Sequence, residues 1–295
     1  MKKKILCVLM AISFVLAPQS ISKADSVTED MKPYISLGAD LTNSQKETVY
    51  SLLGVNEEDL SNYTMGEVTN DEEHEYLGDY ISADVIGSKA LSSVLVTKTE
   101  EGTGIGVDTH NITYCTSGMY TNALITAGIK DADVVVAGPF NITGTAALVG
   151  AMNAYSAMTG EDISDEQKDA ATNELVVTSE LAKSTGDVEK CEQVIALVKK
   201  KVVEDGLDTE EEISDAVSEA ADEVGLSLTD DQKQTITKLM NKISALDIDA
   251  DSLKEQAKDL YDQLSNLDTS GWWESICEFF SNLIDSIVDW FKSLF

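Results

Sequence analysis

The chain has 295 residues, a length that usually means about two domains and a real hydrophobic core. It carries 53 acidic side chains against 21 basic ones, and every basic residue is lysine. Nucleic-acid binding needs a basic face and usually arginine forks, so this composition excludes it. The same charge repels anionic lipid headgroups and wall polymers at long range, while it keeps an exported protein soluble.

The N-terminus has the three parts of a secretory signal peptide. Three lysines at positions 2–4 precede an apolar run over residues 5–17, and Ser-Lys-Ala stands directly before Asp25. The apolar run is too short to span a bilayer. We therefore expect residues 1–24 to be removed, and the mature protein to be secreted or peripheral on the outer face of the cell membrane. Its 17 remaining lysines would face all 53 acids.

Residues 25–160 mix strand and helix patterns. PYISLG is a short strand, and the next segment opens a helix with Thr42 as N-cap and Gln45 three residues later, a capping box. Residues 92–99 and 105–113 are rich in Val, Ile and Thr and predict two strands, joined as a hairpin by the turn EEGTG.

The same region continues with MYTNALITAG, a predicted helix, and ADVVVAG, a predicted buried strand. GPFNITGTAALVGAMNAYSAMTG then reads as a loop followed by a helix of small residues. This order predicts an α+β or α/β N-terminal domain, a small sheet with helices.

Beyond Gly160 the pattern is helical only, which predicts an all-α domain over residues 161–268. One apolar pattern there follows heptad spacing. Aspartates at 247, 249 and 251 could divide it into a helical hairpin, and its seam could pack on neighbouring helices or form an intermolecular coiled coil. The apolar positions are Ile236, Leu239, Ile243, Leu246, Ala250, Leu253, Ala257, Leu260, Leu264 and Leu267.

Residues 269–295 predict a C-terminal amphipathic helix. In WWESICEFFSNLIDSIVDWFKSLF, 14 of 24 residues are apolar and recur at alternating spacings of three and four. Glu278 and Asp285 would lie near the centre of a bilayer, so the tail is expected to lie on a surface rather than cross a membrane. That surface could be its own domain, a membrane, a second copy or an envelope protein. The expected contact residues are Trp272, Trp273, Phe279, Phe280, Leu283, Ile287, Trp290 and Phe291.

Three stretches carry a family resemblance: NDEEHEYLGDYISADVIGSKALSS, GTGIGVDTHNIT and MYTNALITAGIKDADVVVAGPFNITGTAALVGAMNAY. Together they resemble the YpuA-like family, secreted proteins of Gram-positive bacteria classed as domain of unknown function 1002. The matching motifs cover roughly residues 35–180, and the signal peptide and aromatic tail are similar as well. The resemblance implies location and fold class but no activity and no catalytic residue.

Motifs for nucleotide, metal or nucleophilic chemistry are weak. GTGIG stands between two strands rather than before a helix, and GPFNITGT lacks the lysine and glycine spacing of a phosphate loop. The helix start after GPFNITGT could still hold an anion on free N–H groups. His74 and His110 have no metal-binding spacing, and the odd set Cys115, Cys191 and Cys277 is no disulfide framework. We predict no cofactor, no metal and no nucleotide.

Two function classes remain. The favoured hypothesis is a non-enzymatic binding protein of the cell envelope or exterior, which acts through its helical domain and apolar tail. The alternative is an extracellular hydrolase of cell wall or glycan that uses a carboxylate pair. Its catalytic residues cannot be singled out among 53 acids.

Overall fold

The computed structural model describes residues 31–246 and 250–265. The expected signal peptide and the C-terminal tail, residues 269–295, lie outside this part. From the N-terminus the elements are β1 (Tyr34–Gly38), α1 (Asn43–Leu52), the 3-10 helix η1 (Glu57–Asn62), β2 (Thr64–Val68), α2 (Asn70–Leu77), α3 (Ala83–Ile86), β3 (Ser93–Lys98), β4 (Ile105–Ile112), α4 (Ser117–Thr126), β5 (Ala132–Ile142) and α5 (Thr145–Thr159). Helices follow: α6 (Asp165–Thr185), α7 (Val188–Asp205), α8 (Glu210–Val224), α9 (Asp230–Ser244) and α10 (Ala250–Ser265).

The five strands form one mixed sheet in the order β2-β1-β3-β5-β4. The expectation that β3 and β4 form a hairpin is wrong, because β5 lies between them, antiparallel to β3 and parallel to β4. The expected loop GPFNI is also wrong, since these residues continue β5 as far as Ile142. β2, in the stretch TMGEV, was not predicted, because it is short and mostly exposed.

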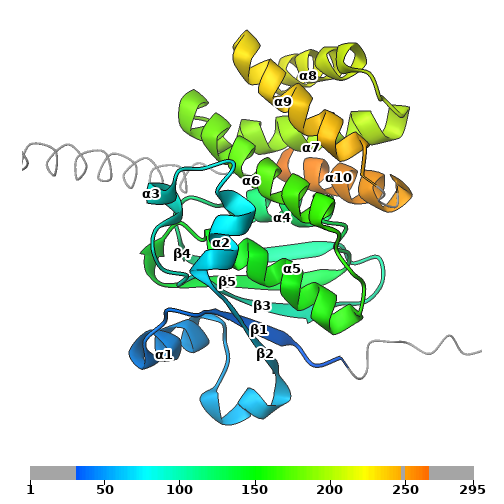
Figure 1. Cartoon of the computed structure of the whole chain (residues 1–295). Helices are drawn as coiled ribbons and strands as arrows, with labels where there is room; N and C mark the ends of the chain where they lie inside the picture. The colour runs from blue at the N-terminus through cyan, green and yellow to red at the C-terminus, as the bar shows by residue number, and fades with distance from the viewer. Residues whose placement is uncertain (1–30, 247–249, 266–295) are drawn as a thin grey trace, which may run out of the picture.

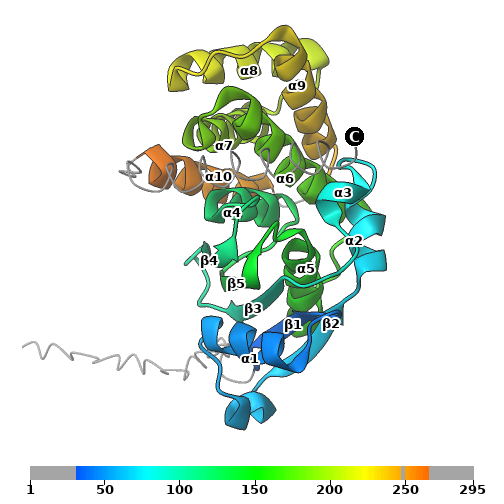
Figure 2. The ribbon, with the colours of Figure 1, turned by 90° about the vertical axis from the view of Figure 1, so that its left-hand side faces the viewer.

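The two faces of the sheet are covered by different helices. Val134 and Val136 of β5 face α4 and α5, whereas the alternate residues Val135 and Ala137 face the cluster that contains α1. Figures 1 and 2 show α4 and α5 on one side of the sheet and α1 with η1 on the other. The predicted capping box of α1 is present, with Thr42 and Gln45 bonded in both directions.

Helices α6–α10 form a further layer above α4 and α5 (Figures 1 and 2). The largest hydrophobic cluster is continuous from the sheet strands through α4 and α5 to α10. The predicted class, a small sheet with helices followed by helices alone, is therefore confirmed for the described residues. The domain boundary at 160/161 stays a prediction, and one core crosses it.

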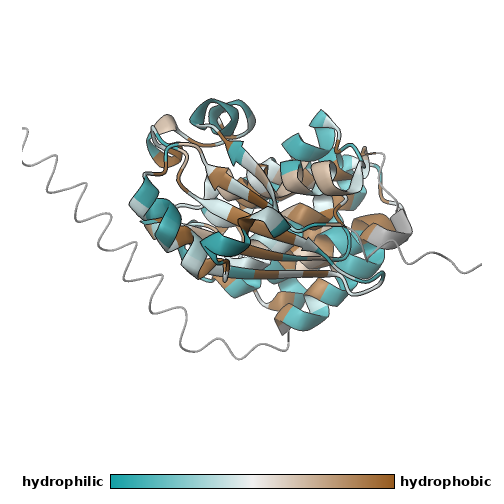
Figure 3. Ribbon diagram, turned by 90° about the horizontal axis from the view of Figure 1, so that it is seen from below, coloured by the Kyte–Doolittle hydropathy of each residue, from teal (hydrophilic) through white to brown (hydrophobic). Residues whose placement is uncertain are grey.

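The heptad pattern falls on two separate helices, α9 and α10, and its described positions face inward. Ile236, Leu239 and Ile243 of α9, and Leu253 and Leu260 of α10, are all buried in the main cluster. Viewed from below, the strands carry much of the hydrophobic colour, and the helices around them alternate between hydrophobic and hydrophilic residues (Figure 3). Intramolecular packing thus explains this seam.

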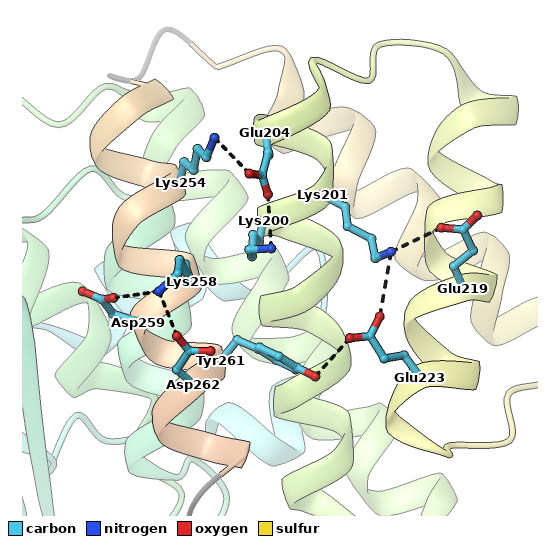
Figure 4. Close-up of polar contacts among 10 residues, drawn as sticks. All are labelled: Lys200, Lys201, Glu204, Glu219, Glu223, Lys254, Lys258, Asp259, Tyr261 and Asp262. Carbon is cyan, nitrogen blue, oxygen red and sulfur yellow. Dashed lines mark hydrogen bonds and ion pairs between the residues drawn. The ribbon is translucent and has the colours of Figure 1, made fainter.

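Ion pairs on the surface of the helical layer connect α10 and α8 to α7 (Figure 4). Glu204 of α7 lies 3.1 Å from both Lys254 of α10 and Lys200 of its own helix. Lys201 of α7 pairs with Glu219 of α8 at 3.2 Å. Exposed pairs contribute little individually, about 0–1 kcal/mol. Their main effect is to place lysines where acids would otherwise repel one another.

Gly38 provides a test of strand packing. A Cβ at this position would overlap the carbonyl oxygen of Ala90 and lie 2.7 Å from Leu91 Cα, both backbone atoms. Gly38→Ala should therefore lower the free energy of unfolding by about 1–3 kcal/mol in urea denaturation. Gly66→Ala on the neighbouring strand β2 is the matched control, because the three atoms nearest to its Cβ all belong to the side chain of the partly exposed Tyr34 and not to the backbone. Equal losses in both variants would contradict this packing.

Candidate functional site

The contact residues predicted in the tail lie outside the part of the chain that the structure describes. They are Trp272, Trp273, Phe279, Phe280, Leu283, Ile287, Trp290 and Phe291. Their role stays a prediction. The described part of the chain shows the surroundings of the two glycine-containing loops, the two histidines, Cys115 and Cys191, whereas Cys277 lies outside it. It also contains a groove that the sequence did not reveal.

The GTGIG loop holds a carboxylate of its own chain. Gly102 and Gly104 have positive φ, and their N–H groups donate to Asp131 Oδ1 at 2.9 and 3.0 Å. Lys98 lies 3.6 Å from the other carboxylate oxygen. These N–H groups would be the ones to bind a phosphate, so Asp131 already occupies the position of an external anion.

The start of α5 is also occupied internally. The N-cap residue, Gly144, has no side chain that could accept a hydrogen bond from the helix. The carboxylate of Glu73 of α2 lies at this helix start instead and accepts a hydrogen bond from the Thr145 hydroxyl. Glu73 is 2% exposed, and burial raises its pKa although the bonds from Thr145, Asn70 and the Ala146 backbone act against this. The proposed anion site at this helix is therefore filled by a buried glutamate.

Helix α4 has a glutamate at its N-terminus as well. Thr116, the N-cap, donates its hydroxyl to Glu192 of α7, and a Cβ at Gly118 would overlap the Glu192 carboxylate. Glu192 is 4% exposed, and desolvation raises its pKa to about 7. The close approach of this side chain explains why residue 118 is glycine.

A buried ion pair lies near the other end of α4. Lys199 Nζ of α7 is 2.6 Å from Glu174 Oε1 of α6, and both side chains are 0% exposed. Lys199 also donates to Asn122 O and Oδ1 at 2.8 and 3.3 Å, so α4 provides two acceptors for the buried ammonium group. Glu174 accepts from the Thr126 hydroxyl. Burial raises the pKa of Glu174 and lowers that of Lys199, and their mutual attraction offsets part of both shifts.

The histidines and described cysteines have structural surroundings. His74 Nε2 lies 3.0 Å from Gly87 O, and His110 Nε2 lies 3.5 Å from Asp108 Oδ2. Cys115 and Cys191 are buried and free, and desolvation raises the pKa of each thiol to about 12. Thiols of such high pKa are poor nucleophiles.

An open groove of about 530 Å³ lies between α6 and α9. It follows one face of α6 from Asn173 to Ser184, about 16 Å at 1.5 Å per residue. Its floor is apolar and its rim is acidic. The floor consists of Val176, Val177, Leu181 and Ile236, and the rim includes Asp79, Glu180 and Asp231.

Hydrogen bonds link the walls of this α6–α9 groove at both ends. At one end Gln232 Nε2 of α9 donates to Ser184 Oγ of α6 at 2.9 Å. At the other, Lys242 Nζ of α9 lies 2.7 Å from Asp169 Oδ2 of α6 and 2.7 Å from the hydroxyl of Tyr80, which itself donates to Asp169. These contacts connect α6 and α9 directly on both sides of the groove.

A second groove, of about 740 Å³, lies between α8 and α9. Its acids Glu210, Glu211, Asp230 and Asp231 belong to the first turns of the two helices. Carboxylates there stabilise the positive ends of the helix dipoles.

Among residues 31–246 and 250–265, no group of three His, Cys, Asp or Glu side chains could hold a metal ion. Within the same residues, no helix has the length and hydropathy of a membrane span.

The geometry defines a mixed-sheet α/β protein with a helical layer and a groove in that layer. A family model described as "Protein of unknown function (DUF1002)" matches residues 37–260. The uncharacterized protein YpuA of Bacillus subtilis (strain 168) is 39% identical over 297 residues, which cover 99% of this chain and 100% of that protein. No solved structure matches. The chain therefore belongs to this YpuA-like family of unknown function, as its motifs predicted.

The ion pair beneath α4 should be costly to break. Lys199→Met leaves Glu174 buried without its cation, and we expect a loss of about 3–5 kcal/mol in the free energy of unfolding. The double variant Lys199→Met with Glu174→Leu removes both charges and should lose less than the sum of the two single variants. Urea unfolding at pH 7 measures both effects. Lys201→Met, on the exposed side of the same helix, is the control and should lose under about 1 kcal/mol.

Glu192 should make stability depend on pH. Its folded pKa of about 7 is above the unfolded value of 4.5, so the folded state binds the extra proton between these pH values. The stabilisation of the folded state that comes from this proton is complete below pH 4.5 and is lost as the pH rises through 7. Between pH 5 and pH 8 the wild type should lose about 2–3 kcal/mol more than Glu192→Gln, which stays neutral. Parallel pH profiles for wild type and variant would contradict this, and Glu166→Gln, an exposed change, is the control.

Proposed function

We propose that this protein is a secreted, non-enzymatic binding protein of the cell envelope or exterior, which acts through its helical domain and its apolar tail. The observation that carries the proposal is the α6–α9 groove, an apolar floor with an acidic rim. Shaped apolar concavities with a few polar groups are the usual form of binding sites.

The carboxylates with raised pKa support binding over hydrolysis. Glu73, Glu174 and Glu192 are each bonded to a threonine hydroxyl of α4, α5 or their caps, and none of them lines either groove. A hydrolase of the predicted kind needs two carboxylates facing one substrate cleft. These three buried acids instead serve as helix partners, and the carboxylates that do line the α6–α9 groove, Asp79, Glu180 and Asp231, are on its exposed rim.

The sequence of the tail supports a partner outside the described part of the chain. A stripe of 14 apolar side chains has a gross burial free energy on the order of 20–40 kcal/mol. In residues 31–246 and 250–265, the large hydrophobic side chains that are exposed are Met65 and Phe140, at 41% and 50%. We therefore propose that the tail lies on a membrane surface or on a second copy of the chain.

Tryptophan fluorescence tests this proposal, because all three tryptophans of the chain are in the tail. The emission of the mature protein should shift to the blue on addition of phosphatidylcholine liposomes, or with rising protein concentration if the tail self-associates. A blue-shifted emission in dilute, lipid-free monomer would mean that the tail packs on its own domain. Water-like emission under every condition would contradict burial of the stripe.

Two single variants of the tail make the result specific. Leu283→Asp places a charge within the apolar stripe and should abolish the shift, whereas Ser281→Asp adds the same charge on the polar side and should leave it intact. If both variants behave alike, the shift reports general charge rather than an amphipathic surface.

A further inference from the structure

The α6–α9 groove has a chemical character that differs from the rest of this acidic surface. Its floor comes from valine, leucine and isoleucine side chains, whereas three carboxylates stand on its rim, from three separate segments. Asp79 follows α2, Glu180 lies in the middle of α6, and Asp231 belongs to the first turn of α9. Among the described residues that line it, none is a lysine.

Two lysines beside this groove, Lys242 and Lys183, are paired with other residues of the chain. Lys242 is bound at one end by Asp169 and Tyr80. Lys183 lies 3.8 Å from Glu180, but both side chains are about half exposed, so the pair is weak. A hydrogen bond from the Tyr114 hydroxyl, 3.1 Å from Glu180 Oε1, holds the Glu180 carboxylate in place. The rim is thus left with negative charge beside an apolar floor.

This combination selects a ligand with a long apolar stem and a cationic end. Lysine and arginine side chains have this form, because their methylene groups cover apolar surface while the charged group stays at a polar rim. The length of the groove, about 16 Å, is the reach of about five extended residues. An acidic occupant would meet like charges at the rim, and this excludes the chain's own tail with its four acids and one lysine.

We propose that the α6–α9 groove binds a short basic segment of another polypeptide, in which lysine or arginine alternates with apolar residues. This rests on the proposed function and names the partner class of its groove. The apolar side chains cover Val176, Val177 and Ile236, and the cationic groups pair with Asp79, Glu180 and Asp231. The rim carboxylates contribute short-range ion pairs and exclude acidic segments, while the floor supplies the contact area.

The test uses the mature full-length protein and a fluorescein-labelled hexapeptide of alternating leucine and lysine. Fluorescence anisotropy at an ionic strength of about 0.15 M reports binding, since exposed long-range attraction is largely screened there. Two control peptides separate the two parts of the proposal. One has glutamate in place of lysine and the other has serine in place of leucine, and neither should bind appreciably.

Three variants locate the binding. Asp79→Asn with Glu180→Gln removes two rim charges, and Thr235→Trp fills the groove from an exposed position of α9 without a change in charge. Each should weaken the affinity for the leucine–lysine peptide by about tenfold or more. Glu57→Gln with Glu58→Gln removes the same charge from η1, across the sheet from the helical layer (Figure 1), and should change affinity by less than about twofold.

Specific outcomes would overturn the proposal. No anisotropy change with the leucine–lysine peptide would do so, and so would equal weakening by the rim pair and the η1 pair, which would mean general attraction to an acidic protein. Tight binding of the serine–lysine peptide would remove the role of the apolar floor. Since the tail is tested with liposomes and tryptophan emission, failure of the groove leaves that result standing, and the reverse also holds.

Discussion

The burial of α4 is the constraint on which the rest of the structure depends. Every residue of this helix from Met119 to Thr126 is buried between the sheet and the helical layer, although Asn122 and Thr126 carry polar side chains. Unpaired polar groups at such depth would cost about 1–3 kcal/mol each. The neighbouring helices therefore supply charged partners, with Glu192 at the start of α4 and Lys199 with Glu174 towards its end. The carboxylate of Glu192 at the N-terminus also agrees with the direction of the helix dipole.

Buried carboxylates also explain why the sequence motifs were misleading about anion-binding sites. The glycine loop and the start of α5 have N–H groups suited to an anion, and the chain fills both from within, with Asp131 and Glu73. Sequence alone detects the backbone feature but cannot show which carboxylate reaches it. A usable signal existed for the buried charges in α7. Glu192 and Lys199 are seven residues apart and in phase with Val188, Ile195 and Val202, so they occupy the apolar face of that helix.

The local patterns predicted most elements because their signals were short-range. The capping box at Thr42, the β-branched runs of β3 and β4, and the apolar periodicity of α6–α10 each lie within one segment. The pairing of strands was mispredicted because β5, which begins 20 residues after the end of β4 (132 − 112), separates two strands that are consecutive in the chain. The α6–α9 groove was missed for a similar reason, since Tyr80, Asp169 and Lys242 come from three distant elements.

The position of β5 has a consequence for how the protein reaches its fold. β3 and β4 leave a gap that only β5 can fill, and β5 follows both strands and α4 in the chain. The hydrogen-bond ladders in the middle of the sheet therefore close late, and α4 stays uncovered until α6 and α7 have also emerged. Contacts between distant segments slow folding, because loop closure must precede them. The neighbouring strands β2, β1 and β3 can pair as soon as β3 is complete at Lys98, whereas β4 has no partner strand until β5 is present.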